Sequence, residues 1–262
     1  MSGGHAGPEN LYVPGASAVH RARPELKIAA AVGSIAAVVA TPREAVWAFG
    51  LHAALVAGVV AAAGLAPGLV ARRMRIELPF LAFGAFLPLV GGDPRVDVLG
   101  SGVSLSEPGL WAGWNIVAKG TLGVAVSVVL AATTTVPDLL GGLERLRVPR
   151  VITSIAGFMV RYLSIVVDEG RRMHVARQSR GYEPRWIWQA RGVAASAGTL
   201  FVRAFERGER VHLAMLSRGY TGTTPSRLRF SDRHGRSQER NFGVVAVPLA
   251  AWAVTVAAWG LT

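Results

Sequence analysis

The chain has 262 residues, of which 51% are hydrophobic, and it carries a formal net charge of +12 without a single cysteine. This apolar content is ordinary for a polytopic membrane protein and high for a soluble one. The lack of cysteine excludes a disulfide framework, a thiolate metal site and a cysteine nucleophile.

Five apolar stretches predict membrane spans, at about 26–40, 45–70, 77–91, 110–136 and 242–261. The residues before them lack an apolar core and are rich in glycine and proline at their start, so we expect a disordered tail over 1–19. Small residues in the second span, among them Gly58 and Ala61, predict close contact with another helix of this chain or of a partner subunit. In the fourth span, Lys119 either snorkels to the interface or faces protein.

The positive charge is concentrated between two groups of spans. From Asp138 to Arg240 there are 19 arginines against 9 acidic residues, which gives +10 of the total +12. Loop 92–109 is acidic instead. This asymmetry predicts that 138–240 is cytoplasmic and that 92–109 lies outside, and it argues against a nucleic-acid-binding protein.

Seven residues of segment 172–182 recur at one constant offset in segment 210–220. They are Arg172, His174, Ala176, Ser179, Arg180, Gly181 and Tyr182, which return as Arg210, His212, Ala214, Ser217, Arg218, Gly219 and Tyr220. Each copy reads as a helix end, because good helix formers lead to an arginine and then to a glycine suited to a left-handed residue. The two arginines are therefore predicted at the tips of two helices, where their charge suits the helix dipole.

The chain resembles the transmembrane T component of energy-coupling factor (ECF) importers, the CbiQ/EcfT family, and most of all its cobalt-type CbiQ branch. The residues that carry the resemblance are Thr134–Leu140, Leu146–Pro149, Tyr162, Glu206–Arg210 and Ala214–Tyr220. The resemblance is strongest in the last two stretches, of which Ala214–Tyr220 is long and specific.

The resemblance implies an all-α polytopic membrane bundle of about five transmembrane helices with a cytoplasmic helical coupling module, in the cell inner or plasma membrane. It implies four regions: the tail 1–19, transmembrane helices 1–4 in 20–137, the coupling module in 138–240 and a last transmembrane helix in 241–262. In this family two Ala-Arg-Gly motifs dock on two ABC-type ATPase subunits. Their counterparts here are Ser179, Arg180, Gly181, Ser217, Arg218 and Gly219, with serine in place of alanine.

The resemblance also implies that a separate membrane subunit, the S component, binds the substrate, and that the partner ATPases hydrolyse ATP. We therefore expect no enzymatic activity, cofactor or metal site in this chain, which has no Gly-x-x-x-x-Gly-Lys sequence. Cobalt ion is the expected substrate, with nickel or a vitamin as alternatives.

Two other functions remain open from the residues alone: an intramembrane enzyme and a self-contained carrier. The first needs a nucleophile with a base, paired acids or metal ligands. His52 is the only histidine in a predicted span, has no acidic neighbour there, and is more simply explained as a packed residue. A carrier needs polar residues along several spans, whereas three of the five are almost wholly apolar. The two arginines, for their part, could merely cap their own helices.

Overall fold

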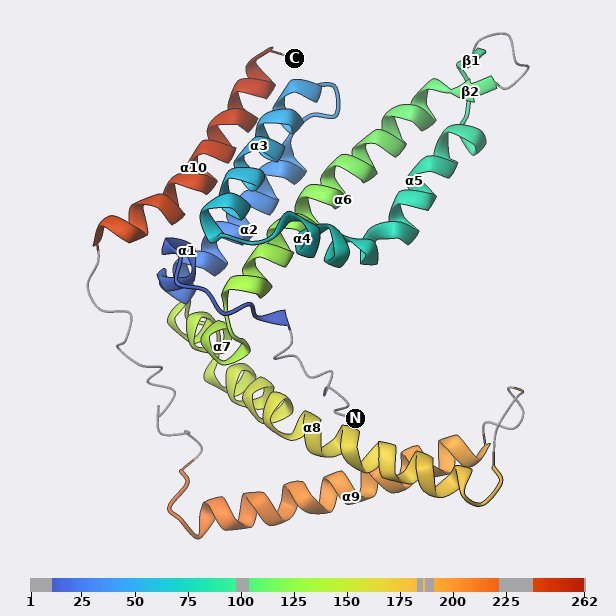
Figure 1. The fold of residues 1–262 in the computed structure, drawn as a ribbon, viewed down its shortest axis with the longest axis vertical. Helices are drawn as coiled ribbons and strands as arrows, with labels where there is room; N and C mark the ends of the chain where they lie inside the picture. Colours follow the sequence, from blue (N-terminus) through green and yellow to red (C-terminus); the bar gives the residue numbers. More distant parts are fainter. Residues whose placement is uncertain (1–10, 98–103, 183–185, 187–190, 222–237, 262) are drawn as a thin grey trace. The chain divides into compact units, whose positions relative to one another are not determined.

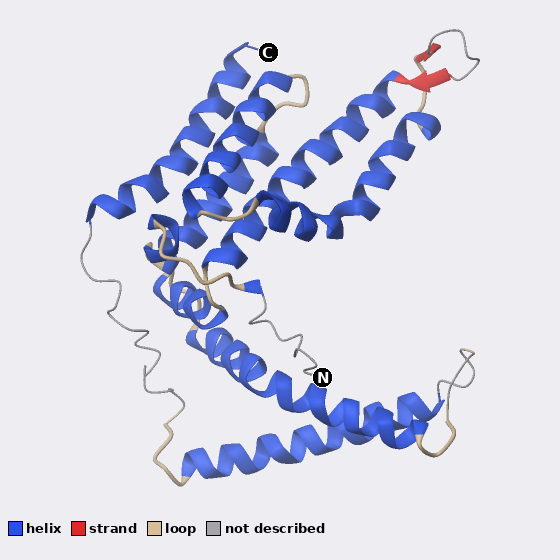
Figure 2. Cartoon of the chain, in the orientation of Figure 1, coloured by secondary structure: helices blue, strands red, loops and turns tan. Residues whose placement is uncertain are grey.

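The computed structural model describes residues 11–97, 104–182, 186, 191–221 and 238–261, and nearly all of its elements are helices (Figures 1 and 2). The elements are α1 (Ala18–Arg21), α2 (Pro24–Ala40), α3 (Val46–Ala63), α4 (Pro67–Met74), η2 (Arg75–Glu77), α5 (Leu78–Val90), β1 (Arg95–Asp97), β2 (Ser104–Ser106), α6 (Glu107–Thr133), α7 (Val136–Arg145), α8 (Arg150–Gln178), α9 (Arg191–Leu216) and α10 (Gln238–Leu261). They fall into two compact units. The bundle unit contains α1–α7 and α10, and the hairpin unit contains α8 and α9.

Four helices of the described chain are long and apolar enough to cross a membrane: α3, α6, α8 and residues 243–261 of α10. The predicted all-α polytopic membrane fold is confirmed. The predicted spans 26–40 and 77–91 correspond to α2, with 17 residues, and α5, with 13. The predicted span 45–70 is divided, because Gly64 takes a left-handed conformation (φ 67°) and ends α3 before α4 begins.

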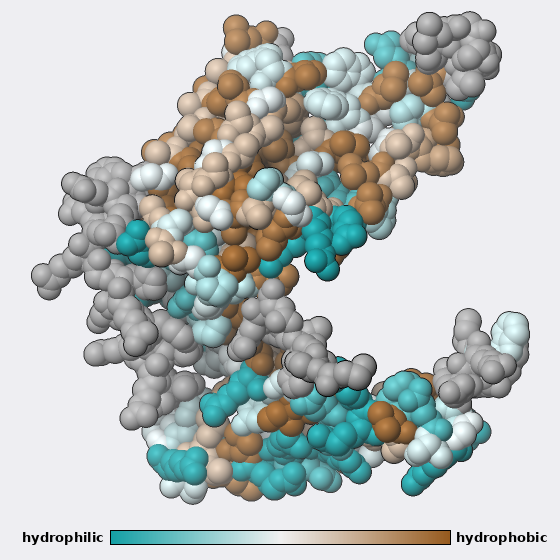
Figure 3. Space-filling model, viewed as in Figure 1, coloured by the Kyte–Doolittle hydropathy of each residue, from teal (hydrophilic) through white to brown (hydrophobic). Residues whose placement is uncertain are grey.

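The five predicted spans do not include α8, although its length and apolar first half are sufficient for a membrane span. Its second half carries Arg171, Arg172 and Arg177, which favours a position outside the bilayer. Figure 3 shows hydrophilic surface gathered over α8 and α9 and over α4, whereas hydrophobic surface covers much of the rest of the bundle unit.

Helices α5 and α6 make the closest helix contact of the bundle unit through small residues. A Cβ on Gly113 would overlap the carbonyl oxygen of Gly84, and one on Gly109 would lie 2.6 Å from the carbonyl oxygen of Leu87. Two small residues of the second span, by contrast, do not pack closely against another helix. Gly58 has open space at its Cβ position, and Ala61 is exposed. Gly58 and Ala61 therefore do not make the predicted contact with another helix of this chain, and a contact with a partner subunit stays a prediction.

We expect Gly113→Ala to destabilise the bundle by about 1–3 kcal/mol, because an added methyl group must push two backbones apart. Gly123→Ala on the same helix is the matched control. A Cβ there meets open space, so the better helix propensity of alanine should leave stability equal or slightly higher. Thermal unfolding in detergent measures both. Equal melting temperatures for the two variants would contradict the tight α5–α6 contact.

Residues 11–23 form a strap across the end of α6, which differs from the expectation of disorder up to residue 19. The backbone N–H of Val13 donates to the carbonyl oxygen of Ala132 (2.9 Å). His20 is buried, with Nε2 3.0 Å from the carbonyl oxygen of Val13 and Nδ1 2.7 Å from Oγ of Ser17. These bonds satisfy polar groups that a disordered tail would leave to water. Residues 1–10 of the predicted tail lie outside the described residues.

The strap should loosen in acid because of His20. Burial lowers the pKa of His20, and the positive charge of Lys27 lowers it further, although the bond to Val13 acts in the opposite direction. The folded strap therefore holds His20 neutral, and this stability is present above the ordinary pKa of about 6.5 and is lost as the pH falls below it. Hydrogen-exchange protection factors for residues 11–23 should fall between pH 7.5 and pH 5. In His20→Gln the protection should no longer depend on pH, and an unchanged dependence would refute the role of His20.

Lys27 fixes the corner between α6 and α7. It is 6% exposed, and its Nζ donates to the carbonyl oxygens of Thr133 (2.9 Å) and His20 (3.0 Å) and to Oγ1 of Thr134 (3.4 Å). Thr133 is the last residue of α6, so its carbonyl has no partner within the helix. The ammonium group therefore satisfies an orphan carbonyl and complements the negative end of the helix dipole.

Helix α7 then packs along the start of α2. Gly142 approaches so closely that a Cβ there would lie 3.1 Å from the backbone N of Glu25, and Arg145 pairs with the Glu25 carboxylate at 3.3 Å. After α7 the chain turns at Arg147, which is left-handed (φ 66°), and enters α8 behind Pro149. Helix α7, which begins at the corner held by Lys27, is thus the last element of the bundle unit before the chain passes into the hairpin unit.

Candidate functional site

The two copies of the repeat end their helices with the same backbone geometry, as predicted. Gly181 (φ 73°) and Gly219 (φ 82°) are both left-handed. Tyr182 N–H donates to the carbonyl oxygen of Arg177 (3.1 Å), and Gly181 N–H donates to that of Gln178 (2.9 Å). The second copy repeats these bonds 38 residues later, from Tyr220 to Met215 (3.0 Å) and from Gly219 to Leu216 (2.9 Å). Each end is therefore a Schellman motif with arginine as its C-cap residue.

The serines that replace the family's alanines are accommodated by their own helices. Ser179 Oγ donates to the carbonyl oxygen of Ala176 and Ser217 Oγ to that of Ala214, each at 3.0 Å. The substitution thus leaves no hydroxyl in need of an external partner. The turns also need glycine, because a side chain on a left-handed residue is strained.

The side chains of Arg180 and Arg218 are exposed, and neither guanidinium pairs with any described residue of the chain. The backbone bonds that close each helix end come from the residues after the arginines, so capping does not use the guanidinium groups. A guanidinium is planar and always charged, and it can form two parallel bonds to one carboxylate. Both tips are thus available for an acidic partner.

The helices that carry the tips form an antiparallel hairpin. The Glu169 carboxylate of α8 pairs with Arg172 of its own helix (2.7 Å) and with Arg203 of α9, and Gly170 faces Leu200 at the same level. From this contact to Arg180 is 10 residues, and from Leu200 to Arg218 is 18 residues in the opposite direction. At 1.5 Å per residue, the path between the tips is about 40 Å. Figure 1 shows the two helix ends at opposite sides of the hairpin unit.

Sequence reasoning missed two contacts that hold this hairpin. The hydroxyl of Tyr182 accepts the backbone N–H of Gly192 (3.1 Å), and thereby satisfies an orphan donor in the first turn of α9. A Cβ on Gly192 would lie 2.6 Å from Cζ of that ring. The Glu169–Arg172 pair has helical i, i+3 spacing and is visible in the sequence. The contacts to Arg203 and Gly192 depend on how the hairpin folds and leave no local signal.

Apolar side chains are exposed along both helices of the hairpin unit. Ile155, Met159 and Leu163 follow each other at four-residue spacing on α8 and are 44–67% exposed. On α9, Phe201 and Phe205 stack with ring centroids 6.5 Å apart and are also largely exposed. Contiguous exposed apolar side chains are typical of surfaces that other proteins or lipid cover.

The polar residues inside the bundle are held by other parts of the chain. His52 is 2% exposed, with Nε2 3.2 Å from Oγ1 of Thr41 and 3.5 Å from Oγ1 of Thr255, which confirms its interpretation as a packed residue. Lys119 faces protein and donates to the carbonyl oxygen of Val39 (2.7 Å). Within the described ranges, no three His, Asp or Glu side chains lie close enough together to hold a metal ion.

These features define a class: an all-α polytopic membrane protein whose basic helical hairpin presents two separate arginine tips. Residues 15–228 match the CbiQ family, described as cobalt transport protein. The chain therefore belongs to the CbiQ family. It is 31% identical over 136 residues to the cobalt transport protein CbiQ of Rhodobacter capsulatus, which covers 52% of this chain and 53% of that protein. It is 26% identical over 224 residues to the energy-coupling factor transporter transmembrane protein EcfT of Bacillus selenitireducens, covering 80% and 82%.

The alignment thus spans about half the length of the Rhodobacter relative and most of the Bacillus relative. The matched family and both relatives carry the names of transport proteins.

Proposed function

We propose that this chain is the energy-coupling transmembrane subunit of an ECF-type ABC importer, linking two cytoplasmic ATPase subunits to a substrate-binding membrane subunit. The observation that carries the proposal is the duplicated helix end with an exposed arginine and no partner among the described residues. A helix cap alone does not need a guanidinium, so the recurrence of arginine at both tips favours an external acidic partner.

The geometry of the hairpin unit supports two docking positions. With about 40 Å of helix between them, the two tips are suited to two separated grooves, one on each ATPase subunit. When ATP brings the two subunits together, both grooves move, and rigid helices α8 and α9 would carry that movement toward the bundle. Such coupling requires that the two nucleotide states differ in their contacts with the tips.

The exposed apolar side chains of α8 and α9 support a membrane subunit as the second partner. Polar groups inside the bundle already form hydrogen bonds with other parts of this chain. This supports substrate binding by the second membrane subunit and not by the bundle. We propose cobalt ion as the substrate, on the strength of the family description and the name of the Rhodobacter relative. Nickel and vitamins are the alternatives that an uptake assay decides.

Co-purification tests this proposal. The tagged chain, expressed in its own cells and extracted in mild detergent, should bring down two ATPase subunits and one small membrane subunit, counted by native mass spectrometry. Vesicles containing the complex should accumulate radioactive cobalt only with ATP inside the compartment that the ATPases face, with nickel and vitamins as competitors. A chain that purifies alone and transports cobalt without an ATPase would refute the proposal.

Topology is a separate prediction, and the absence of cysteine makes it easy to test. A cysteine at Glu209, exposed on α9, should react with a membrane-impermeant maleimide only after the cells are opened. One at Asp93, exposed in the loop before β1, should react in intact cells. The physical reason is the arginine excess of 138–240 against the acidic loop 92–109. Labelling of Glu209→Cys from outside would overturn a cytoplasmic coupling module.

A further inference from the structure

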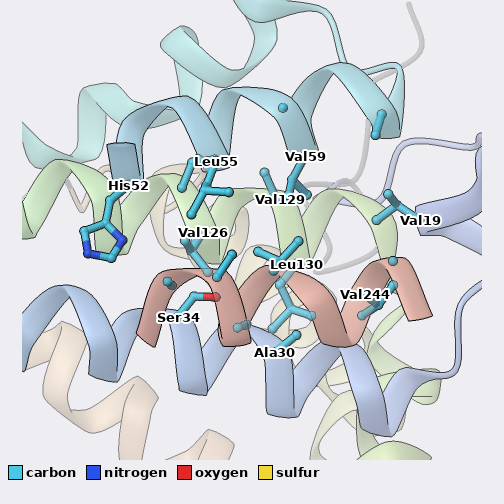
Figure 4. A pocket seen from close by; sticks show the side chains of 18 of the residues that line it. Val19, Ala30, Ser34, His52, Leu55, Val59, Val126, Val129, Leu130 and Val244 are labelled. Carbon is cyan, nitrogen blue, oxygen red and sulfur yellow. The ribbon is translucent and has the colours of Figure 1, made fainter. Parts of the chain in front are cut away.

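An elongated cavity of about 630 Å³ runs between α2, α3, α6 and α10 in the bundle unit. Figure 4 shows Leu55 and Val59 of α3, Val126, Val129 and Leu130 of α6, and Val244 of α10 around it. Neither the coupling mechanism nor the family membership accounts for it. Its lining is almost entirely aliphatic, and such a cavity stays free of water and accepts apolar molecules.

The polar groups at the wall leave little for a polar ligand to bind. Lys27 donates to three oxygens of the protein, and His52 lies within hydrogen-bond distance of two threonine hydroxyls. The hydroxyl of Ser34 points toward the cavity (Figure 4), and a single neutral hydroxyl is no site for an ion. Metal ions and polar vitamins are therefore unsuitable occupants.

The dimensions of the cavity select among apolar occupants. Its lining extends from Lys27 to Val38 on α2, from Leu51 to Ala62 on α3 and from Gly243 to Val254 on α10. Each of these distances is about 16 Å at 1.5 Å per residue. A space of this length with an almost wholly aliphatic wall fits a single extended alkyl chain.

The length also matches one layer of a bilayer. The hydrocarbon core is about 30 Å thick, so the chains of one leaflet reach about 15 Å deep. One end of the cavity lies at Val19 and Val244. Arg21 and Arg23, which follow Val19 closely in the chain, are exposed. The other end lies at His52. Exposed basic residues at the first end suit the anionic phosphate of a phospholipid headgroup.

The cavity can be reached from the side. Leu51, Ala54 and Gly58 line it and are exposed in the chain, on a helix long and apolar enough to span the membrane. Lipid surrounds such a helix in the bilayer. We propose that the cavity is a binding site for one acyl chain of a phospholipid from the leaflet next to Arg21 and Arg23, with the chain end directed toward His52.

Photo-crosslinking of the full chain in vesicles of phosphatidylglycerol and phosphatidylethanolamine tests the site. A phosphatidylglycerol probe with a diazirine at the end of one acyl chain should label Leu51 and Val254, at the deep end of the cavity. A probe with the diazirine next to the ester should label Val19 and Val244 instead. Labelling that spreads evenly over exposed residues outside the cavity, such as Val32 and Val39, would overturn the proposal, as would the reverse order of the two probes.

Filling the cavity should abolish the site. Gly58 lines the cavity and has open space at its Cβ position, so the ring of Gly58→Phe should occupy the cavity. Gly50 lies on the same helix and also has open space, but it does not line the cavity, so Gly50→Phe is the matched control. Native mass spectrometry after detergent washing should find one retained phospholipid on the unmodified chain and on Gly50→Phe, and its loss from Gly58→Phe. Ala30→Phe fills the same cavity from α2 and should lose the lipid too, which provides a second reading if Gly58→Phe fails to fold. Equal retention by all variants, or retention of detergent alone, would refute the assignment.

Discussion

Replacing both Arg180 and Arg218 with alanine should abolish substrate uptake while the chain still folds and inserts. Each guanidinium is exposed at a helix tip and pairs with none of the described residues, so its loss removes no described contact within the chain. In the proposed complex each forms a charge-assisted contact worth about 1.5–3 kcal/mol, or roughly a 10- to 150-fold change in affinity for the ATPase. Each single variant should weaken ATPase binding and reduce uptake, and the double variant should lose both.

The measurements are ATPase pull-down and cobalt uptake by vesicles, with thermal unfolding as a check on folding. Arg171→Ala is a suitable control, because Arg171 is also an exposed arginine of α8 without a described partner, but it lies nine residues before the tip. It should retain ATPase and uptake. A double variant that keeps its ATPase and full uptake would show that the tip arginines are only the last residues of their helices.

Replacing Lys27 with methionine should destabilise the bundle more than Gly113→Ala does. Methionine fills a similar volume but leaves the carbonyl oxygens of Thr133 and His20 buried without a donor. Each unsatisfied buried acceptor costs about 1–3 kcal/mol, so the total is about 2–6 kcal/mol. The chain's other lysine provides the control. Lys119→Met removes one bond, to the carbonyl oxygen of Val39, and this bond is exposed, so the cost should be at most about half as large.

The same variant bears on coupling, because Lys27 ties α2 to the corner from which the chain continues through α7 into α8. In Lys27→Met complexes that still assemble at low temperature, ATP hydrolysis should continue while the number of ions imported per ATP falls. Lys27→Arg keeps the charge and the donors and should restore part of that ratio. An unchanged melting temperature would show that the corner does not depend on this ammonium group. An unchanged number of ions imported per ATP would show that Lys27 stabilises the corner without contributing to coupling.

The sequence determined much of this protein by itself. Long apolar runs require helices, because only helices satisfy their own backbone groups in lipid. The arginine excess of 138–240 predicts on which side of the membrane the hairpin unit lies. The glycines of the repeat fixed both helix ends, because a left-handed C-cap is a local property that glycine alone adopts without strain. The serine-arginine-glycine triplets could therefore be found, and their equivalence recognised, without a structure.

Other features were decided only by the tertiary structure, because they depend on residues that are distant in the chain. Lys27 gains its role from a carbonyl 106 residues away, and the side chain of Glu169 meets Arg203 across the hairpin. The small residues Gly84 and Gly113 gave no stronger local signal than Gly58, yet the first two bring helices together and the third borders a cavity. Small side chains permit close approach without specifying a partner, so packing of all the helices against one another selects which glycines are in contact.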